Sequence, residues 1–277
     1  MSDQRTHSAI TGDGVTIVGT VHGQGRPLAF LHGMIGDGDL DWNPLLQHLS
    51  GRFTCHLLSL RGRGLSGDHD DLTPGRLVED VLTYADSIGE PIGLAGWSYG
   101  AHLALAVAAQ SDAVDAVACL EPGVLSLMDE REQAVLGAAV ARTGELAAEG
   151  RLADAARAFA GWPFTGEEIT LAERAGYFEA AGRYVPNLLN LLQQSTQYED
   201  PTADDPAVLG AISAPVVVLH GSHTSPFLIA SAQYVADHVP NARVHQIPGA
   251  GHAALLTHPE ALAAPLIQFF AQPQQSA

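Results

Sequence analysis

Short runs of apolar and β-branched residues alternate with longer helical patterns along most of this sequence, and no other feature restricts its fold as strongly. The run 91–97, PIGLAGW, is apolar without alternation, as expected for a strand covered on both faces. Strands that alternate with helices favour an α/β protein whose central sheet is mostly parallel and has helices on both faces. The expected strands are 15–21, 27–33, 53–60, 91–97, 115–121, 215–221 and 242–248, and the expected helices are 41–50, 72–89, 98–110 and 258–270.

The interval between Pro122 and Ala214 breaks this alternation. It contains no strand pattern, is rich in Ala, Glu, Arg and Leu, and has Thr165 and Glu168 at the spacing of a capping box. The sequence therefore predicts a core made of residues 1–122 and 214–277, and an inserted all-helical lid, residues 123–213, over one end of the sheet. The helices expected in the lid are about 129–149, 151–161, 166–182 and 184–197, with a return loop at 198–206.

Charge and cysteine usage disfavour several classes of partner. The formal net charge is −18 and the chain has no lysine, so phosphate backbones and anionic membranes would repel it. We therefore expect no nucleic-acid or membrane partner, and a small, neutral, apolar substrate. Cys55 and Cys119 fall in apolar runs without a disulfide or CxxC spacing, and the polar N-terminus lacks the apolar stretch of a secretion signal. These features favour a cytoplasmic location, and no feature indicates an oligomeric state.

The motif GWSYG at 96–100 places Ser98 between an apolar strand and a helix. In a strand–nucleophile–helix elbow, the serine sits on a tight, strained turn, and flanking glycines let the neighbouring backbones approach. The start of the helix also offers N–H groups to a developing anion. The simpler alternative is a glycine-rich turn with an ordinary N-cap serine.

Two further loops follow strands and carry the groups that such a serine needs. LHGMIG at 31–36 is the place for a second oxyanion donor, which would be the backbone N–H of Met34 acting with that of Tyr99. PGAGH at 248–252 carries His252 in a glycine-rich loop, where a general base could reach the serine. The other histidines considered for this role are His32, His102, His220, His223 and His258, of which His102 and His220 are expected to be structural.

Across nearly its whole length the chain resembles the α/β-hydrolase fold. The motifs HGMIG, RGRGLS, GWSYG, PVVVLHG and GAGH occur in that family's order and approximate spacing. The resemblance implies a chain order of nucleophile, acid and histidine, with a lid inserted before the late strands. It also makes Ser98 the nucleophile and His252 the base.

Two positions depart from the family pattern. Ser59 stands where the family usually has Asp before RGxGxS, which is expected to cost local hydrogen bonds rather than catalysis. Thr224 stands where the family most often has its triad acid, and a neutral threonine cannot stabilise an imidazolium. Glu121, at the carboxyl end of the strand after the nucleophile's helix, is the candidate acid, as in haloalkane dehalogenases and some mycotoxin lactonases of that family. The alternative for Glu121 is a strand-end residue that is solvated or caps the lid, and the reserve acids are Asp200, Asp204 and Asp205.

These residues predict a serine hydrolase that cleaves a neutral carboxylic ester or lactone through an acyl-enzyme, without a metal or cofactor. The same triad could instead serve C–C bond hydrolysis or cofactor-free perhydrolysis, and the Thr224 departure also allows a degenerate hydrolase that acts as a ligand receptor. The residues expected to line the substrate pocket are His32, Gly33, Trp97, Trp162, Phe164, Tyr177 and Tyr184.

Overall fold

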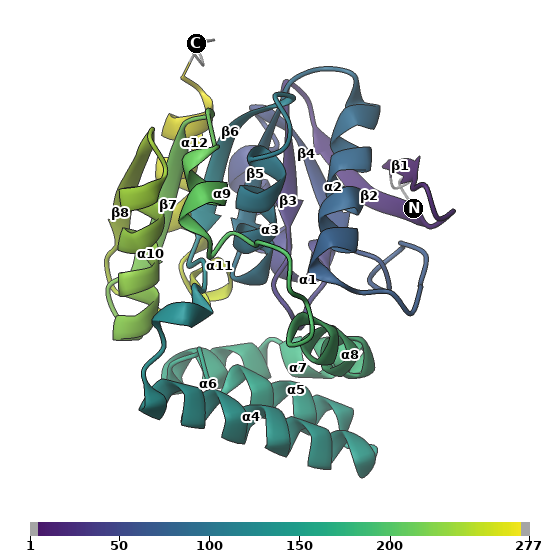
Figure 1. Cartoon of the computed structure of the whole chain (residues 1–277), viewed down its shortest axis with the longest axis vertical. Coiled ribbons are helices and arrows are strands. Elements are labelled where there is room, and N and C mark those ends of the chain that lie inside the picture. Colours follow the sequence, from purple (N-terminus) through teal and green to yellow (C-terminus); the bar gives the residue numbers. More distant parts are fainter. Residues whose placement is uncertain (1–4, 273–277) are drawn as a thin grey trace.

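A single twisted sheet organises the chain in this computed structural model, which describes residues 5–272 (Figure 1). The eight strands lie in the order β1-β2-β4-β3-β5-β6-β7-β8. β1 and β2 pair antiparallel, as do β2 and β4, and every other neighbouring pair is parallel, so the prediction of a mostly parallel sheet is confirmed. The strands are β1 (Thr6–Ile10), β2 (Thr16–Gly23), β3 (Arg26–Leu31), β4 (Phe53–Ser59), β5 (Ile92–Trp97), β6 (Val114–Leu120), β7 (Val216–Gly221) and β8 (Ala242–Ile247).

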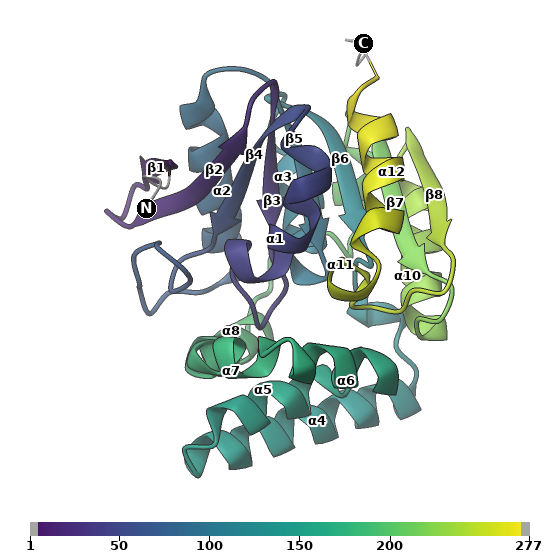
Figure 2. The same ribbon diagram turned by 180° about the vertical axis from the view of Figure 1, so that it is seen from behind.

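Helices cover both faces of the sheet, as predicted (Figures 1 and 2). Side chains of β3 alternate between two cores: Leu28 and Phe30 belong to the cluster of α1 and α12, whereas Ala29 and Leu31 belong to the cluster of α2, α3 and α10. Every central strand is therefore buried from both sides, which explains its continuous apolar run. The helices are α1 (Gly38–Leu49), α2 (Pro74–Ile88), α3 (Tyr99–Ala108), α10 (Pro226–His238), α11 (Ala254–Thr257) and α12 (Pro259–Phe270).

Local signals explain where these elements begin and end. The helix expected at 72–89 is α2, with Thr73 at the N-cap, Pro74 as its first residue and Gly89 in the left-handed region at φ 78°. β1 and α10 were missed. β1 is an edge strand with mostly polar, exposed residues, so its pattern is weak. α10 did carry a signal, because Ser225 caps it and Pro226 is its first residue.

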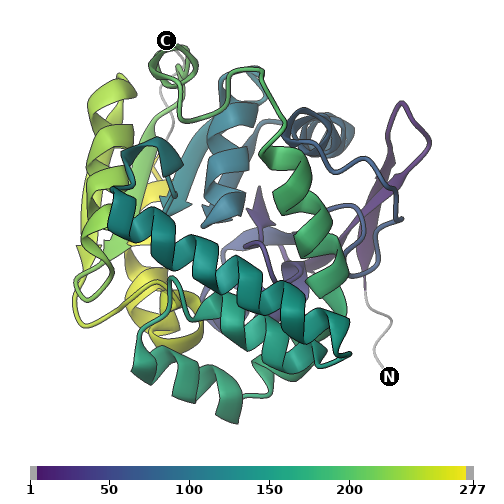
Figure 3. The ribbon, with the colours of Figure 1, turned by 60° about the horizontal axis from the view of Figure 1, so that its bottom comes forward.

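Residues 123–213, which we call the inserted helical segment, lie entirely within the described range and contain helices but no strand. All of these helices but the last, at 206–210, lie across the carboxyl ends of the parallel strands (Figure 3), whereas the last one packs against α3 and α10 (Figure 1). The single helix expected at 166–182 is in fact two, because Gly176 adopts φ 70° between them. The segment contains the 3₁₀ turns η1 (Leu125–Leu127) and η2 (Gly182–Tyr184), and the helices α4 (Glu130–Ala148), α5 (Leu152–Ala160), α6 (Gly166–Arg174), α7 (Tyr177–Ala181), α8 (Val185–Ser195) and α9 (Pro206–Gly210).

One hydrophobic core joins this segment to the sheet. The cluster that contains Phe30 and α12 continues through Trp97 to Phe164 and Phe159 of the segment. The carboxyl ends of the strands are thus covered by apolar side chains as well as by helices. Within residues 5–272, no helix combines the length and hydropathy that crossing a bilayer requires.

Candidate active site

Ser98 occupies a strained turn between β5 and α3. Its backbone has φ 54° and ψ −119°, a region that costs a non-glycine residue on the order of 1–3 kcal/mol. Nearby segments of the backbone leave room only for a tight turn here. A Cβ on Gly96 would lie 2.2 Å from the Gly100 carbonyl oxygen, and one on Gly100 would lie 2.3 Å from that of Leu31. The glycines of GWSYG therefore allow close backbone contact, and the elbow holds Ser98 at the start of α3.

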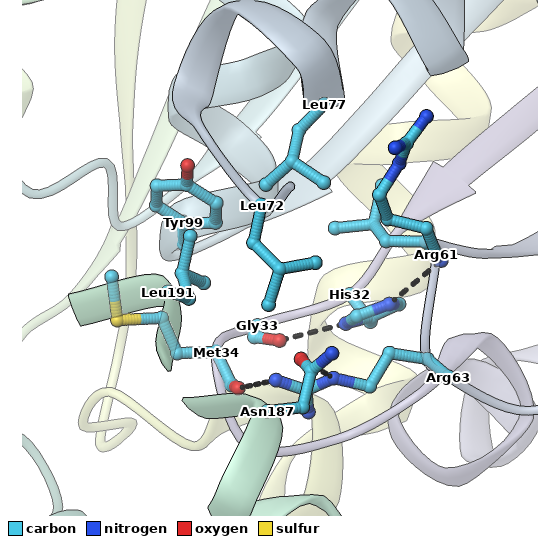
Figure 4. Close-up of a pocket in the computed structure, with 11 residues that line it drawn as sticks. His32, Gly33, Met34, Arg61, Arg63, Leu72, Leu77, Tyr99, Asn187 and Leu191 are labelled. Atoms are coloured by element: carbon cyan, nitrogen blue, oxygen red, sulfur yellow. Dashed lines mark hydrogen bonds between the residues drawn. The ribbon is translucent and has the colours of Figure 1, made fainter. Parts of the chain in front are cut away.

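The loop after β3 is fixed by buried polar groups. Gly33 donates its N–H to Asp41 Oδ2 at 2.9 Å, and the Met34 carbonyl accepts from Arg63 Nη2 at 2.7 Å (Figure 4). With the Gly33 amide occupied, the next amide along the loop is that of Met34. On the other side of the site, Tyr99 is the first residue of α3, so its N–H has no acceptor within the helix.

His32 is structural. Its Nε2 accepts the N–H of Leu60 at 3.1 Å, which leaves Nδ1 protonated and donating to the Gly33 carbonyl at 2.7 Å. Burial, followed by the charge of Arg63, lowers the pKa of His32 to about 4. The ring is therefore neutral at physiological pH and holds the loop rather than exchanging protons.

Glu121 and His252 form a buried pair at the same edge of the sheet. Glu121 Oε2 lies 3.0 Å from His252 Nδ1, and both residues are almost fully buried. The second oxygen of Glu121, Oε1, accepts the N–H of Gly221 at 2.6 Å. Thr224 donates its hydroxyl to Oε2, also at 2.6 Å. Thr224, which stands at the family's usual acid position, thus donates a hydrogen bond to the carboxylate of Glu121, which follows β6.

The backbone of Glu121 is strained like that of Ser98. Its φ is 53°, and among the described residues only Glu121 and Ser98 are non-glycine residues with positive φ. They follow directly on the neighbouring parallel strands β6 and β5. Strain of this kind persists only where the surroundings impose it, and it clusters at functional sites.

The reserve acids lie elsewhere. Asp204 Oδ1 is 3.3 Å from Nδ1 of His102, whose ring stacks on Tyr99 at 6.3 Å between centroids. Asp205 caps α9 by accepting the Ala207 N–H at 2.7 Å, and Asp200 is exposed. Among the histidines, His220 bonds the carbonyl of Gly221, which fits its structural role.

Aromatic residues surround His252. Its ring centroid lies 5.5 Å from that of Trp97 and 6.0 Å from that of Phe164. The other predicted pocket residues of the inserted helical segment make contacts with other residues. Tyr177 donates its hydroxyl to Asp41 at 2.9 Å, Tyr184 donates to Asp37, and Trp162 packs on Phe227.

A small cavity lies behind the loop that carries Met34 (Figure 4). Four of the predicted site residues line it, namely His32, Gly33, Met34 and Tyr99. The remaining lining is mainly leucine, together with Arg61, Arg63 and Asn187. The cavity adjoins both candidate oxyanion donors. Trp97, Phe164 and His252 are not among the residues that line it.

Several residues of the site were not predicted. Asp41 is fully buried between the Met34 loop and Tyr177, and burial raises its pKa to about 7. It lies in the first turn of α1, in the stretch DGDLD at residues 37–41. Arg63 is buried without a carboxylate partner among residues 5–272, and it bonds the carbonyls of Gly36 and Met34 and the side chain of Asn187. No local pattern indicates these contacts. No group of three or more His, Cys, Asp or Glu in the described part of the chain is arranged to hold a metal ion.

The sheet order, the elbow at Ser98 and the late histidine define an α/β hydrolase. The model of the alpha/beta hydrolase family matches residues 28–264, so the chain belongs to this family and the predicted fold is confirmed. A pimeloyl-(acyl-carrier protein) methyl ester esterase of Xanthomonas campestris pv. campestris is 30% identical over 261 residues, with 91% of this chain and 97% of the relative covered.

Solved structures support the same assignment. An α/β hydrolase from Sphaerobacter thermophilus has a TM-score of 0.76 at 27% identity, covering 95% of this chain and 100% of its own. A thermophilic esterase from Thermogutta terrifontis has a TM-score of 0.78 at 19% identity, covering 98% and 100% of the two chains. The second likeness establishes the fold alone.

Proposed function

We propose that this chain is a serine hydrolase that cleaves carboxylic esters through an acyl-enzyme. The observation that carries the proposal is the buried Glu121–His252 pair, 3.0 Å apart, beside the strained turn of Ser98. A buried carboxylate on Nδ1 selects the tautomer whose Nε2 is free to accept a proton, and it stabilises the imidazolium that follows. The esterase name of the 30% identical relative supports the same reaction class.

In the proposed reaction, Ser98 Oγ attacks the ester carbonyl while His252 Nε2 takes its proton. The tetrahedral oxyanion accepts hydrogen bonds from the N–H groups of Met34 and Tyr99. The intermediate collapses, the alcohol leaves with the proton from His252, and the acyl group stays on Ser98. Water then gives a proton to His252 and attacks the acyl carbon, and a second collapse releases the acid and returns the proton to Ser98.

The substrate class is proposed more narrowly from the surroundings. The aromatic rings of Trp97 and Phe164 and the leucines near Met34 favour an uncharged, apolar region around the scissile bond. The relative is named as an esterase of a pimeloyl-(acyl-carrier protein) methyl ester. We therefore test methyl esters as substrates together with small aryl esters. We further propose that the inserted helical segment acts as the lid of this site, and that the enzyme is cytoplasmic, in keeping with two free, buried cysteines.

A receptor without catalysis is the second candidate, because Thr224 replaces the usual acid. Its hydrogen bond to Glu121 counts against this reading, since a carboxylate is present where the imidazole needs one. Lactone cleavage, C–C bond cleavage and perhydrolysis would use the same groups and are distinguished by products.

The experiment is covalent labelling of Ser98 by a fluorophosphonate, combined with turnover of p-nitrophenyl butyrate and of methyl esters of increasing acyl length. We expect a single labelled site at Ser98 and ester turnover, both lost in Ser98→Ala. A folded protein that neither labels nor hydrolyses any ester of the panel would support the receptor instead.

A further inference from the structure

The peptide bond between His252 and Ala253 is held at both of its polar groups. The His252 carbonyl accepts from Trp97 Nε1 at 2.8 Å, and the Ala253 N–H donates to Glu168 Oε1, also at 2.8 Å. Both groups belong to one rigid peptide plane, so the two hydrogen bonds fix its rotation. The backbone on the carboxyl side of His252 is therefore clamped between the residue before the nucleophile and a residue of the inserted helical segment.

Glu168 is a buried carboxylate whose two oxygens serve different parts of the chain. It is the third residue of α6 and completes the capping box with Thr165, whose N–H donates to Oε2 at 2.9 Å. Oε1 is left for Ala253, and only 3% of the residue is exposed. The predicted capping box is confirmed, but only one carboxylate oxygen of Glu168 belongs to it, and the other bonds a residue outside the helix.

The histidine loop is shaped to receive this carboxylate. A Cβ on Gly251 would lie 2.6 Å from Glu168 Oε2 and 2.8 Å from its Cδ, so a larger residue there would displace the carboxylate from its present position. Phe164, four residues before Glu168, contacts the imidazole itself with 6.0 Å between ring centroids. The start of α6 thus touches the ring, the preceding glycine and the following amide of His252.

We propose that Glu168 is a positioning residue that couples the docking of the inserted helical segment to the orientation of His252. The inference rests on the proposed roles of Ser98 and His252. When the segment is displaced, the Ala253 amide loses its acceptor and the peptide plane is held on one side only. The imidazole can then turn away from the line between Glu121 and Ser98, and errors of about 1 Å in such a geometry cost on the order of 100-fold in rate.

The test compares Glu168→Gln with two control variants. A glutamine has one carbonyl oxygen, so its amide NH₂ must face either Ala253 or Thr165, both of which are donors. We expect kcat for p-nitrophenyl butyrate to fall by about 10- to 100-fold with KM within about threefold. Glu167→Gln removes an exposed charge on the same helix, and Thr165→Ala weakens the cap of α6 while leaving the Ala253 contact, so both should stay within about threefold of wild type in kcat.

A second readout needs no substrate. The downfield proton resonance of the His252 Nδ1–H, which is bonded to Glu121, should broaden in Glu168→Gln and stay sharp in Thr165→Ala. An unchanged kcat and resonance in Glu168→Gln would overturn the inference, and so would an equal loss in Thr165→Ala, because that result assigns Glu168 to helix capping alone. If the wild type shows no ester turnover, the proposed function fails, and the resonance still decides the positioning role.

Discussion

Replacing Glu121 by glutamine removes one charge and almost no volume, and it tests the acid assignment directly. The wild-type carboxylate accepts three hydrogen bonds, from Gly221 N–H, Thr224 Oγ1 and His252 Nδ1. A glutamine has only one acceptor atom. If its amide NH₂ faced Gly221, two donors would meet at 2.6 Å, and a buried donor left unmatched costs about 1–3 kcal/mol.

The favoured orientation is therefore the opposite one, with the oxygen on Gly221 and the NH₂ toward Thr224 and His252. The threonine hydroxyl can rotate to accept, but the imidazole can accept only if its proton moves from Nδ1 to Nε2. Nε2 then carries the proton and cannot take one from Ser98. We expect kcat to fall by about 10³- to 10⁴-fold, which corresponds to about 4–5.5 kcal/mol in the activation free energy.

The assay is steady-state hydrolysis of p-nitrophenyl butyrate, together with the rate of fluorophosphonate labelling and a thermal melt to verify folding. Thr224→Val keeps the charge and the His252 contact, so its kcat should stay within about tenfold of wild type. The double variant Glu121→Gln/Thr224→Asp returns a carboxylate from the later loop and should recover at least about tenfold over Glu121→Gln. Near-full activity of Glu121→Gln, with loss of activity in Asp204→Asn, would refute the assignment.

Two further predictions concern the surroundings of the site. Burial raises the folded-state pKa of Asp41 to about 7, so its stabilising contribution is present below the unfolded value of 3.8 and is lost as pH rises through about 7. Relative to Asp41→Asn, the unfolding free energy of the wild type should therefore fall by up to about 4 kcal/mol between those pH values. Urea denaturation at pH 4 and pH 8 would measure this difference. A pH-independent difference would contradict the rise in the pKa of Asp41 that burial causes. Gly100→Ala should destabilise the fold by more than about 3 kcal/mol in the same assay, because its Cβ would meet backbone oxygens of Leu31 and His32 at 2.3 and 2.6 Å, and a loss below about 1 kcal/mol would show that the elbow can relax.

The sheet and the order of the site residues were predictable from local patterns. Ser98, Glu121 and His252 each follow a strand pattern, and the carboxyl ends of parallel strands lie at one edge of a sheet, so their placement at that common edge follows from the sequence. Helix ends were predictable where proline and glycine mark them, as at Pro74 and Gly89. The break at Gly176 was not, because a lone glycine inside a helical pattern is often tolerated.

Contacts between distant segments were not predictable. Asp41 bonds Tyr177 across 136 positions of sequence, and Glu168 bonds Ala253 across 85. Periodicity and capping rules describe neighbours within one element and are silent about such pairs. Thr224 shows the same limit in another form. The sequence showed that Thr224 cannot serve as an acid, but it did not show that its hydroxyl donates to the carboxylate of Glu121.

In the proposed enzyme, the bonds that join the inserted helical segment to the core would also govern how a substrate reaches Ser98. On the side of α7 and α8, Tyr177 bonds Asp41, Tyr184 bonds Asp37, and Asn187 bonds Arg63. Lifting that side as a rigid flap would break all three, at about 1.5–3 kcal/mol for each hydrogen bond to a charged group. Such an opening would be occupied for only a small fraction of the time. Entry by small rearrangements of individual side chains costs less, so the proposed lid would select esters by their width before the reaction begins.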